Sequence, residues 1–133
     1  MAKEGRDSNR VAALLICDEH DNILMGRRND DFKWSNPGGH LKVNEDAYEG
    51  AIRELKEETG LDVQEIQLIK MTKCGKNLVY LFEVRVDPDQ IIDPSNDPDK
   101  ESDWWIYVDP NDVREELHIP LEHNVVLKYW IDN

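Results

Sequence analysis

The strongest constraint on the fold is an amphipathic helix that the sequence predicts from Glu45 to Thr59. Asn44 is a candidate N-cap, acidic residues fill the first turn, where the helix dipole favours negative charge, and Gly60 suits a left-handed C-terminal stop. With successive residues about 100° apart, four residues fall on one side of this helix: Tyr48, Ile52, Leu55 and Thr59. We expect that side to pack on a sheet.

Strand-like segments flank the helix on both sides. Five segments are apolar runs bounded by turn residues: 11–18, 23–28, 63–74, 77–86 and 104–108. Turn residues between the first two segments, and Gly-Lys between the next two, predict two hairpins. Two further segments, 109–119 and 120–131, are predicted to form C-terminal helices. Their candidate cap and start residues are Asp109, Asn111 and Pro120.

The length of the chain, 133 residues, suits one domain and is too short for two ordinary ones, so residues 1–133 are predicted to form a single unit. Residues 1–9 are polar and are predicted to be a flexible N-terminal segment. Residues 87–103 hold three of the six prolines and many aspartates, which is the composition of a long acidic loop. Such a loop is either functional or a mobile insertion, and both interpretations stay open.

Charge and hydropathy exclude several classes of partner. The formal net charge of −13 makes a nucleic acid polymer or an anionic membrane a poor partner, because both are densely negative. No segment reaches the ~20 apolar residues of a membrane span, and the N-terminus lacks the apolar core of a signal peptide. We therefore expect a cytoplasmic protein.

The cysteines and histidines give no sign of a metal site. Cys17 and Cys74 lie in apolar runs without paired spacing and are predicted to be buried free thiols. The histidines show no metal-ligand spacing and are assigned no chemistry: His20, His40, His118 and His123.

Three glutamates cluster on a second face of the predicted helix. Glu54, Glu57 and Glu58 stand at i, i+3 and i+4, so like charges are neighbours and destabilise the helix by a few tenths of a kcal/mol each. Small residues occupy the same stripe and are expected to leave room above it: Ala47, Gly50 and Ala51. The cluster is either a solvated face helped by an Arg53 to Glu57 pair, or half of a site for a hard divalent ion such as Mg²⁺.

A longer motif surrounds these glutamates. Residues 39–61, GHLKVNEDAYEGAIRELKEETGL, resemble the signature of the Nudix hydrolases, which is Gly, five residues, Glu, seven residues, Arg-Glu-aliphatic, one residue, Glu-Glu, one residue, Gly-aliphatic. All nine fixed positions are present: Gly39, Glu45, Arg53, Glu54, Leu55, Glu57, Glu58, Gly60 and Leu61. PGG before this box and ILMGRR upstream also resemble family features, so the likeness is at the level of motifs over residues 23–61.

The resemblance implies a fold and an activity. Nudix hydrolases are α/β/α sandwiches with a central mixed sheet, and the order of elements predicted above agrees with that fold. They hydrolyse the pyrophosphate bond of a nucleoside diphosphate linked to another moiety, as in nucleoside triphosphates, dinucleoside polyphosphates and nucleotide sugars. The resemblance implies Mg²⁺ as the cofactor, with Mn²⁺ as a substitute, and a small nucleotide as the substrate.

The resemblance also assigns roles to residues of the box. Glu54, Glu57 and Glu58 would bind the metal together with the Gly38 carbonyl, and Arg53 would orient these glutamates by ion pairing. Glu45 would complete that network, and Gly60 has a structural role. The general base is a box glutamate, with Glu54 and Glu58 as catalytic candidates, or a residue of the later loop. In that loop Glu101 is the first candidate and Asp103 the second, and for each the alternative is an ordinary acidic loop residue.

Residues outside the helix are candidates for binding the substrate. Arg27 or Arg28 could hold a phosphate bidentately, and a surface role is the alternative for each arginine. Gly39 is a further candidate for binding the substrate. Three tryptophans could stack on a base or belong to the core: Trp34, Trp104 and Trp105.

The motifs leave two function classes and several substrates open. The intact box favours the enzyme over a nucleotide-binding regulator without catalysis, which would not need all three glutamates. In the family, a proline shortly beyond the box is associated with ADP-ribose hydrolases, and this region holds Lys73 and Lys76 instead, which disfavours that subclass. Nudix enzymes often dimerise, so the C-terminal VVLKYWI is either a homodimer surface or an amphipathic helix that covers the sheet.

Overall fold

The structure is a computed structural model, and it describes residues 7–97, 102 and 104–133. In this part of the chain the strands form two sheets. The larger has the order β4 (Gly38–Lys42), β1 (Asp7–Ile16), β6 (Asn77–Val86) and β5 (Val63–Cys74). The smaller has the order β3 (Trp34–Ser35), β2 (Ile23–Arg27) and β7 (Trp104–Val108). Three α-helices and two 3₁₀ turns complete it: α1 (Ala47–Thr59), α2 (Pro110–Val113), α3 (Val125–Asp132), η1 (Pro94–Asn96) and η2 (Leu121–His123).

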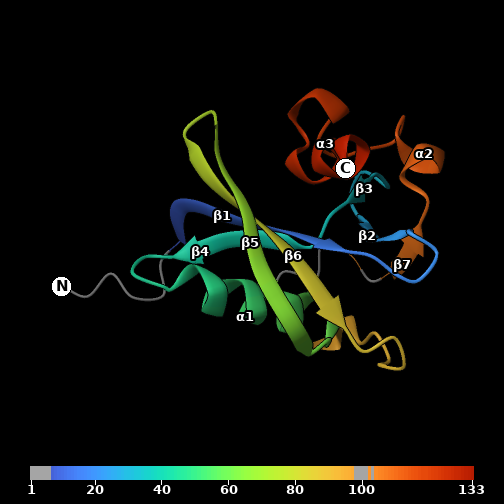
Figure 1. Ribbon diagram of the computed structural model, residues 1–133, viewed down its shortest axis with the longest axis horizontal. Helices are drawn as coiled ribbons and strands as arrows, with labels where there is room; N and C mark the ends of the chain where they lie inside the picture. The colour runs from blue at the N-terminus through green and yellow to red at the C-terminus, as the bar shows by residue number, and fades with distance from the viewer. Residues whose placement is uncertain (1–6, 98–101, 103) are drawn as a thin grey trace.

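The larger sheet is mixed and is covered on both faces. Strand β1 runs parallel to β6 and antiparallel to β4, and β5 runs antiparallel to β6. Leu14 packs in the cluster that contains Leu55 of α1, whereas the next residue, Leu15, packs in the cluster that contains Leu127 of α3. Successive strand residues point to opposite faces, so α1 and α3 lie on opposite sides of the sheet, as Figure 1 shows. The predicted α/β/α sandwich with a central mixed sheet is confirmed.

The first predicted hairpin exists only at its turn. Cys17 and Ile23 form an isolated antiparallel bridge, and the Asp18 amide donates to the Asn22 carbonyl at 2.9 Å. Beyond this bridge the two strands enter different sheets, because β4 and β6 occupy both edges of β1. The second hairpin, β5 with β6, is confirmed, and Gly75 at its turn has a φ of 62°.

Helix α1 begins two residues later than predicted, at Ala47. Asn44 has a φ of 67° and belongs to the preceding turn, so it is not the N-cap. That role falls to Asp46, whose side chain accepts a hydrogen bond from the Glu49 amide at 3.0 Å. Gly60 ends the helix in the left-handed region with a φ of 76°, as predicted.

The buried face of α1 agrees only in part with the predicted one. Leu55 and Thr59 are fully buried, as predicted, whereas Tyr48 is 41% exposed and Ile52 is 40% exposed. The small residues face inward instead, and a Cβ at Gly50 would overlap the Leu41 side chain. Because they allow the helix to approach β4 closely, they leave no room for a ligand above them, and the expectation of such room was wrong.

The C-terminal segments are less helical than predicted. Helix α2 has four residues, capped by Asp109, and Asn111 lies inside it, so Asn111 is not a cap. Pro120 precedes the short turn η2, and Asn124 caps α3 by accepting from the Leu127 amide at 3.0 Å. Val126 is 2% exposed and Leu127 is 1% exposed, so the VVLKYWI segment covers the sheet. No helix in the described part of the chain is long and apolar enough to cross a membrane.

Candidate active site

Arg53 organises the acidic face of α1. Its guanidinium donates to both carboxylate oxygens of Glu45, at 2.8 and 3.0 Å, and these bonds lower the pKa of Glu45. It also donates to Glu54 at 3.2 Å and to Glu57 at 3.1 Å. The hydrogen bonds to Glu45 are the main reason that the pKa of Arg53 is raised. One cation therefore compensates three carboxylates that would otherwise repel one another.

Glu58 points the other way, toward β4. It is 8% exposed, and its Oε1 accepts a hydrogen bond from the Gly38 amide at 2.8 Å. Gly38 has a φ of 137°, and a Cβ there would overlap the Ala12 carbonyl oxygen. A Cβ at Gly39 would stand 2.9 Å from Glu54 Oε2. The two glycines bring the backbone of β4 against the glutamates of α1.

These groups line a hollow of about 330 Å³, which we call the glutamate hollow. Its walls are Asp7, Gly38, Gly39, His40, Lys42, Arg53, Glu54, Glu57, Glu58 and Asp97. Asp97 is 5% exposed and follows η1, in the loop that the sequence predicted at residues 87–103. That loop is fixed to the end of α1 where the Asp93 amide donates to the Thr59 carbonyl at 2.6 Å. The turn η1 of this loop contacts α1, and the loop adds a carboxylate that the sequence had not singled out.

The two loop residues that the sequence favoured as general bases, Glu101 and Asp103, lie outside the described residues. The pattern gave no reason to prefer Asp97, because it is one of several aspartates in an acidic loop.

The donor groups of this hollow fit a hard divalent cation. Carboxylate and carbonyl oxygens are the ligands that Mg²⁺ and Mn²⁺ take, and Gly39 leaves space for the Glu54 carboxylate where a side chain would fill it. Among the described residues, however, no three His, Cys, Asp or Glu side chains converge into a ligand set. Glu54 and Glu57 are turned toward Arg53, and Glu58 toward the Gly38 amide.

A second hollow of about 360 Å³, the adjoining hollow, opens beside the first. The two share four residues: Gly38, Gly39, His40 and Glu58. Two of its side-chain atoms, Asn36 Nδ2 and Asn77 Oδ1, are buried without a hydrogen-bond partner among the described residues. Since buried polar atoms are nearly always paired, a donor and an acceptor left open here suit a ligand with polar edges.

The two candidate arginines have different surroundings. Arg28 lines the adjoining hollow, its side chain is 15% exposed, and it forms an ion pair with Asp30 at 3.0 Å. Arg27 lies over the Phe32 ring, with its guanidinium carbon 5.8 Å from the ring centroid, and donates to the Phe32 carbonyl. The structure thus places Arg28, and not Arg27, at the wall of this hollow.

The tryptophans and the histidines differ in whether they line the adjoining hollow. Trp34 is 7% exposed and Trp105 is 5% exposed, so both belong to the core, whereas Trp104 is 51% exposed. None of the three lines the adjoining hollow. Its wall instead includes three histidines, which no spacing in the sequence indicated: His40, His118 and His123.

The comparison with known families agrees with this geometry. Residues 7–129 match the family model described as the NUDIX domain. The chain belongs to the Nudix family. Among solved structures, a Caenorhabditis elegans Ap4A hydrolase in a binary complex has a TM-score of 0.69 at 18% identity, over 92% of this chain and 96% of that one. An ADP-ribose pyrophosphatase from Streptococcus suis has a TM-score of 0.68 at 21% identity, over 92% of this chain and 89% of that one.

Two curated relatives match less than half of this chain. An 8-oxo-dGTP diphosphatase from Proteus vulgaris is 38% identical over 65 residues, which cover 44% of this chain and 56% of the relative. An RNA pyrophosphohydrolase from a Marinomonas strain is 35% identical over 60 residues, which cover 45% of this chain and 37% of the relative. The match thus spans about half or less of each relative.

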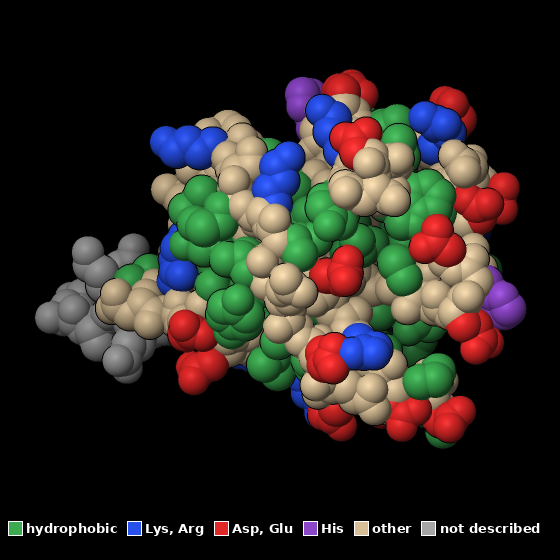
Figure 2. Space-filling model, viewed as in Figure 1, with side chains coloured by type: hydrophobic (Ala, Val, Ile, Leu, Met, Phe, Trp, Pro, Cys, Tyr) green, Lys and Arg blue, Asp and Glu red, His purple; other side chains and the backbone are tan. Residues whose placement is uncertain are grey.

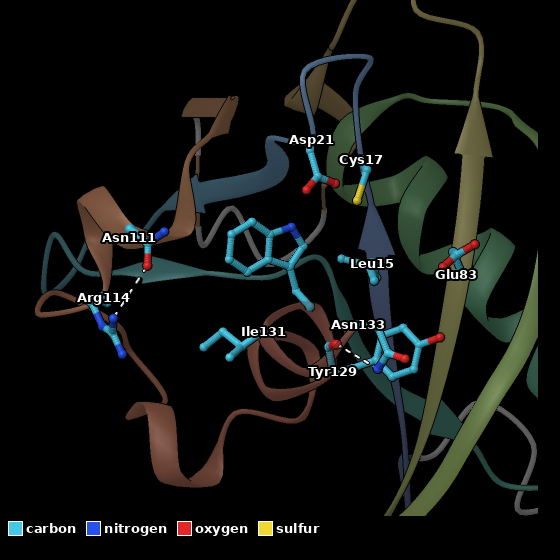
Figure 3. A pocket seen from close by; sticks show the side chains of 10 residues that line it. Leu15, Cys17, Asp21, Glu83, Asn111, Arg114, Tyr129, Ile131 and Asn133 are labelled. Carbon is cyan, nitrogen blue, oxygen red and sulfur yellow. Dashed lines mark hydrogen bonds between the residues drawn. The ribbon is translucent and has the colours of Figure 1, made fainter.

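A further hollow lies at the C-terminal side of this Nudix domain (Figure 3) and shares no residue with the glutamate hollow. Cys17 lines it and is exposed, and Cys74 is half-buried, so the prediction of two buried thiols was wrong. Partial burial of the Cys17 thiol and the nearby charges of Asp21 and Glu83 raise its pKa to about 11. The thiol stays protonated at neutral pH and is not an activated nucleophile.

The bond between Glu45 and Arg53 predicts a dependence of stability on pH. Glu45 has a lowered pKa in the folded protein, so its contribution is complete above the unfolded-state pKa of ~4.3 and is lost as the pH falls through the folded pKa. We expect Glu45→Gln to lower the free energy of unfolding by about 2 kcal/mol at pH 7, and the difference from wild type to shrink below about pH 4.

Urea unfolding of both proteins in EDTA, from pH 7 to pH 3, measures this difference. Glu49→Gln is the matched control, because Glu49 is exposed in the first turn of the same helix and is not among the carboxylates that pair with Arg53 in the described part of the chain. A difference for Glu45→Gln that stays constant down to pH 3 would contradict the assignment.

Proposed function

We propose that the protein hydrolyses a pyrophosphate bond in a nucleoside diphosphate derivative, with Mg²⁺ as the cofactor and Mn²⁺ as a substitute. The observation that carries this proposal is the continuity of the two hollows. Gly38, Gly39 and His40 separate an acidic hollow suited to cations and phosphates from one with open amide groups suited to a nucleoside. The names of the relatives, 8-oxo-dGTP diphosphatase and RNA pyrophosphohydrolase, support the same reaction.

In this proposal Glu54, Glu57 and Glu58 hold the cation together with the Gly38 carbonyl. When bound, the cation neutralises charge on the phosphates and lowers the pKa of a coordinated water. Arg53 keeps Glu54 and Glu57 directed into the hollow, since it bonds both carboxylates, and Glu45 holds Arg53 in turn. The charged side chains of the site are thereby held in position before the substrate binds, so less free energy is needed to reorient them during the reaction.

Two roles remain, which are binding of the phosphates and acceptance of a proton. Arg28 is proposed to bind a phosphate oxygen, since its partly buried guanidinium lines the adjoining hollow, and Gly39 lets the backbone approach the phosphates. A carboxylate is proposed to accept a proton from the attacking water. Glu54 and Glu58 of the box are candidates, and Glu101 of the loop is the alternative.

The test is a panel of nucleotides incubated with the protein and Mg²⁺, with release of phosphate and pyrophosphate measured. The panel contains nucleoside triphosphates, 8-oxo-dGTP, Ap4A, ADP-ribose and a nucleotide sugar. We expect turnover of at least one compound and its loss in EDTA. Binding of a nucleotide by calorimetry without turnover of any compound would support the non-catalytic regulator instead.

A further inference from the structure

A third hollow continues from the adjoining hollow, on the side away from the glutamates. It lies between the end of the β5–β6 hairpin and the start of α3, and it shares Cys74, His123 and Val125 with the adjoining hollow. Three lysines line it: Lys70, Lys73 and Lys128. We call it the lysine groove. Figure 2 shows Lys and Arg side chains over the tip of the hairpin, at the upper left of the molecule.

The charges of this groove are unusual for the molecule. The chain has 16 Lys and Arg residues against 29 Asp and Glu. Cations elsewhere on the molecule, such as Arg53 and Lys56, form ion pairs with carboxylates. The side-chain ammonium groups of the three lysines form no hydrogen bond or ion pair with any residue that the structure describes. The groove also contains one carboxylate, Glu122. Like charges that line one groove repel one another, so the arrangement favours an anion in the groove.

The strand register fixes the direction in which the groove opens. Lys70 is the cross-strand partner of Leu81, and Leu81 is buried in the cluster beneath α3. Lys70 therefore stands on the face of the sheet that α3 covers, and so do Thr72 and Cys74, two and four residues later. Lys73 alternates to the other face of the strand and lines the groove next to the hairpin turn at Gly75. Lys128 approaches from α3 itself. The three hollows are linked through shared residues, and they follow in the order glutamates, open amide groups, lysines.

We propose that the lysine groove binds a phosphate attached to the ribose of the bound nucleotide, on the side away from the bond that is cleaved. The inference rests on the proposed function, because that function places the scissile phosphates at the glutamates and the nucleoside between the two charged ends. A nucleotide with a phosphate on its 3′ side carries anions at both ends and matches this order. The phosphate is either a terminal 3′-phosphate or the first phosphodiester of an oligonucleotide 5′ end.

The net charge of −13 does not oppose this inference. The net charge of the whole chain determines the electrostatic potential far from the surface. Salt screens charges that lie more than about 8–10 Å apart, so the nearest lysines determine the electrostatic energy of a phosphate in the groove. The groove would select a short anionic segment at one place and would not bind nucleic acid along the whole surface.

The test compares the affinities of three product-like probes by calorimetry with Mg²⁺: nucleoside 5′-monophosphates, nucleoside 3′,5′-bisphosphates and 5′-phosphorylated dinucleotides, each with the four bases. We expect the bisphosphate of the preferred base to bind at least about tenfold tighter than the monophosphate, with the preference weakening as salt rises. A gain for the dinucleotide as well places a phosphodiester in the groove, and a gain for the bisphosphate alone places a terminal phosphate there.

The triple variant Lys70→Gln/Lys73→Gln/Lys128→Gln should lose this preference and keep the affinity for the monophosphate. Lys33→Gln/Lys56→Gln/Arg85→Gln removes three exposed cations elsewhere and is the matched control for charge, expected to keep the preference. Equal affinities for all probes in wild type, or equal losses in the two triple variants, would overturn the inference. Turnover in the nucleotide panel together with equal affinities would overturn this inference alone and leave the proposed function standing.

Discussion

Replacing Glu58 by Gln is expected to lower the rate of nucleotide hydrolysis at least about 100-fold. Glu58 is 8% exposed, and one of its oxygens accepts from the Gly38 amide at 2.8 Å. A glutamine keeps that acceptor oxygen and nearly the same shape, so the contact between α1 and β4 survives. The substitution removes the negative charge, which is the property that binding a cation or accepting a proton requires.

The measurement is kcat for the best substrate of the nucleotide panel, with urea unfolding of the same protein. We expect the free energy of unfolding to change by less than about 1 kcal/mol, because the hydrogen bond is retained and one like charge is removed from the cluster. Glu49→Gln removes a charge from the exposed first turn of α1 and should keep the wild-type rate. A Glu58→Gln protein with wild-type activity would refute the proposed role of this residue.

The features that the sequence predicted well are local. Gly60 ends α1 and the β5–β6 hairpin turns at Gly75, because a positive φ at a glycine is decided by a few neighbouring residues. The spacing of Glu54, Glu57 and Glu58 places these residues within about a turn of one another on any α-helix, and all three line the glutamate hollow. Their carboxylates do not converge, because Glu58 is turned toward β4 and the other two toward Arg53. Fixed spacing within one element therefore predicted the acidic face of the site.

Helical periodicity identified part of the buried face of α1. It correctly grouped Leu55 with Thr59, which are fully buried, but it added Tyr48 and Ile52, which are about two-fifths exposed, and it left out Gly50 and Ala51, which are buried. At Gly50 the helix lies so close to β4 that a Cβ would overlap the Leu41 side chain, so only a small residue fits there. How closely two elements pack depends on the side chains of both, so the sequence of the helix alone does not determine its distance from β4.

The remaining residues of the site come together from distant segments. Asn36 precedes β4, Asn77 begins β6, Asp97 follows η1, and all three reach the hollows through pairings that sequence spacing does not reveal. The parallel pairing of β1 with β6 joins residues about 70 positions apart, and no turn sequence between the two strands indicates that they pair. The same reason explains why His118, His123 and the lysine groove could not be assigned from the sequence.

Gly38→Ala is expected to destabilise the protein by about 3–5 kcal/mol, the sum of backbone strain and a steric overlap that the core cannot relieve. Gly38 has a φ of 137°, which residues with a side chain rarely adopt. Its Cβ would overlap the carbonyl oxygen of Ala12. Ala12 cannot move aside, since β1 is paired on one edge with Gly39 of β4 and on the other with Tyr80 of β6. A displaced Gly38 would also lose its hydrogen bond to Glu58.

Urea and thermal unfolding in EDTA measure this loss of stability, and Gly75→Ala is the matched control. Gly75 also has a positive φ, 62°, but a Cβ there would meet no atom within 4 Å. Its replacement should cost about 1 kcal/mol, the strain of the left-handed backbone alone. The difference in free energy of unfolding between the two variants measures the cost of the overlap with Ala12. Equal losses of stability in the two variants would show that β4 can shift to relieve the overlap. If Gly38→Ala accumulates only as insoluble protein while Gly75→Ala folds, the overlap exceeds the stability of the whole domain, as the packed position of Ala12 at 1% exposure allows.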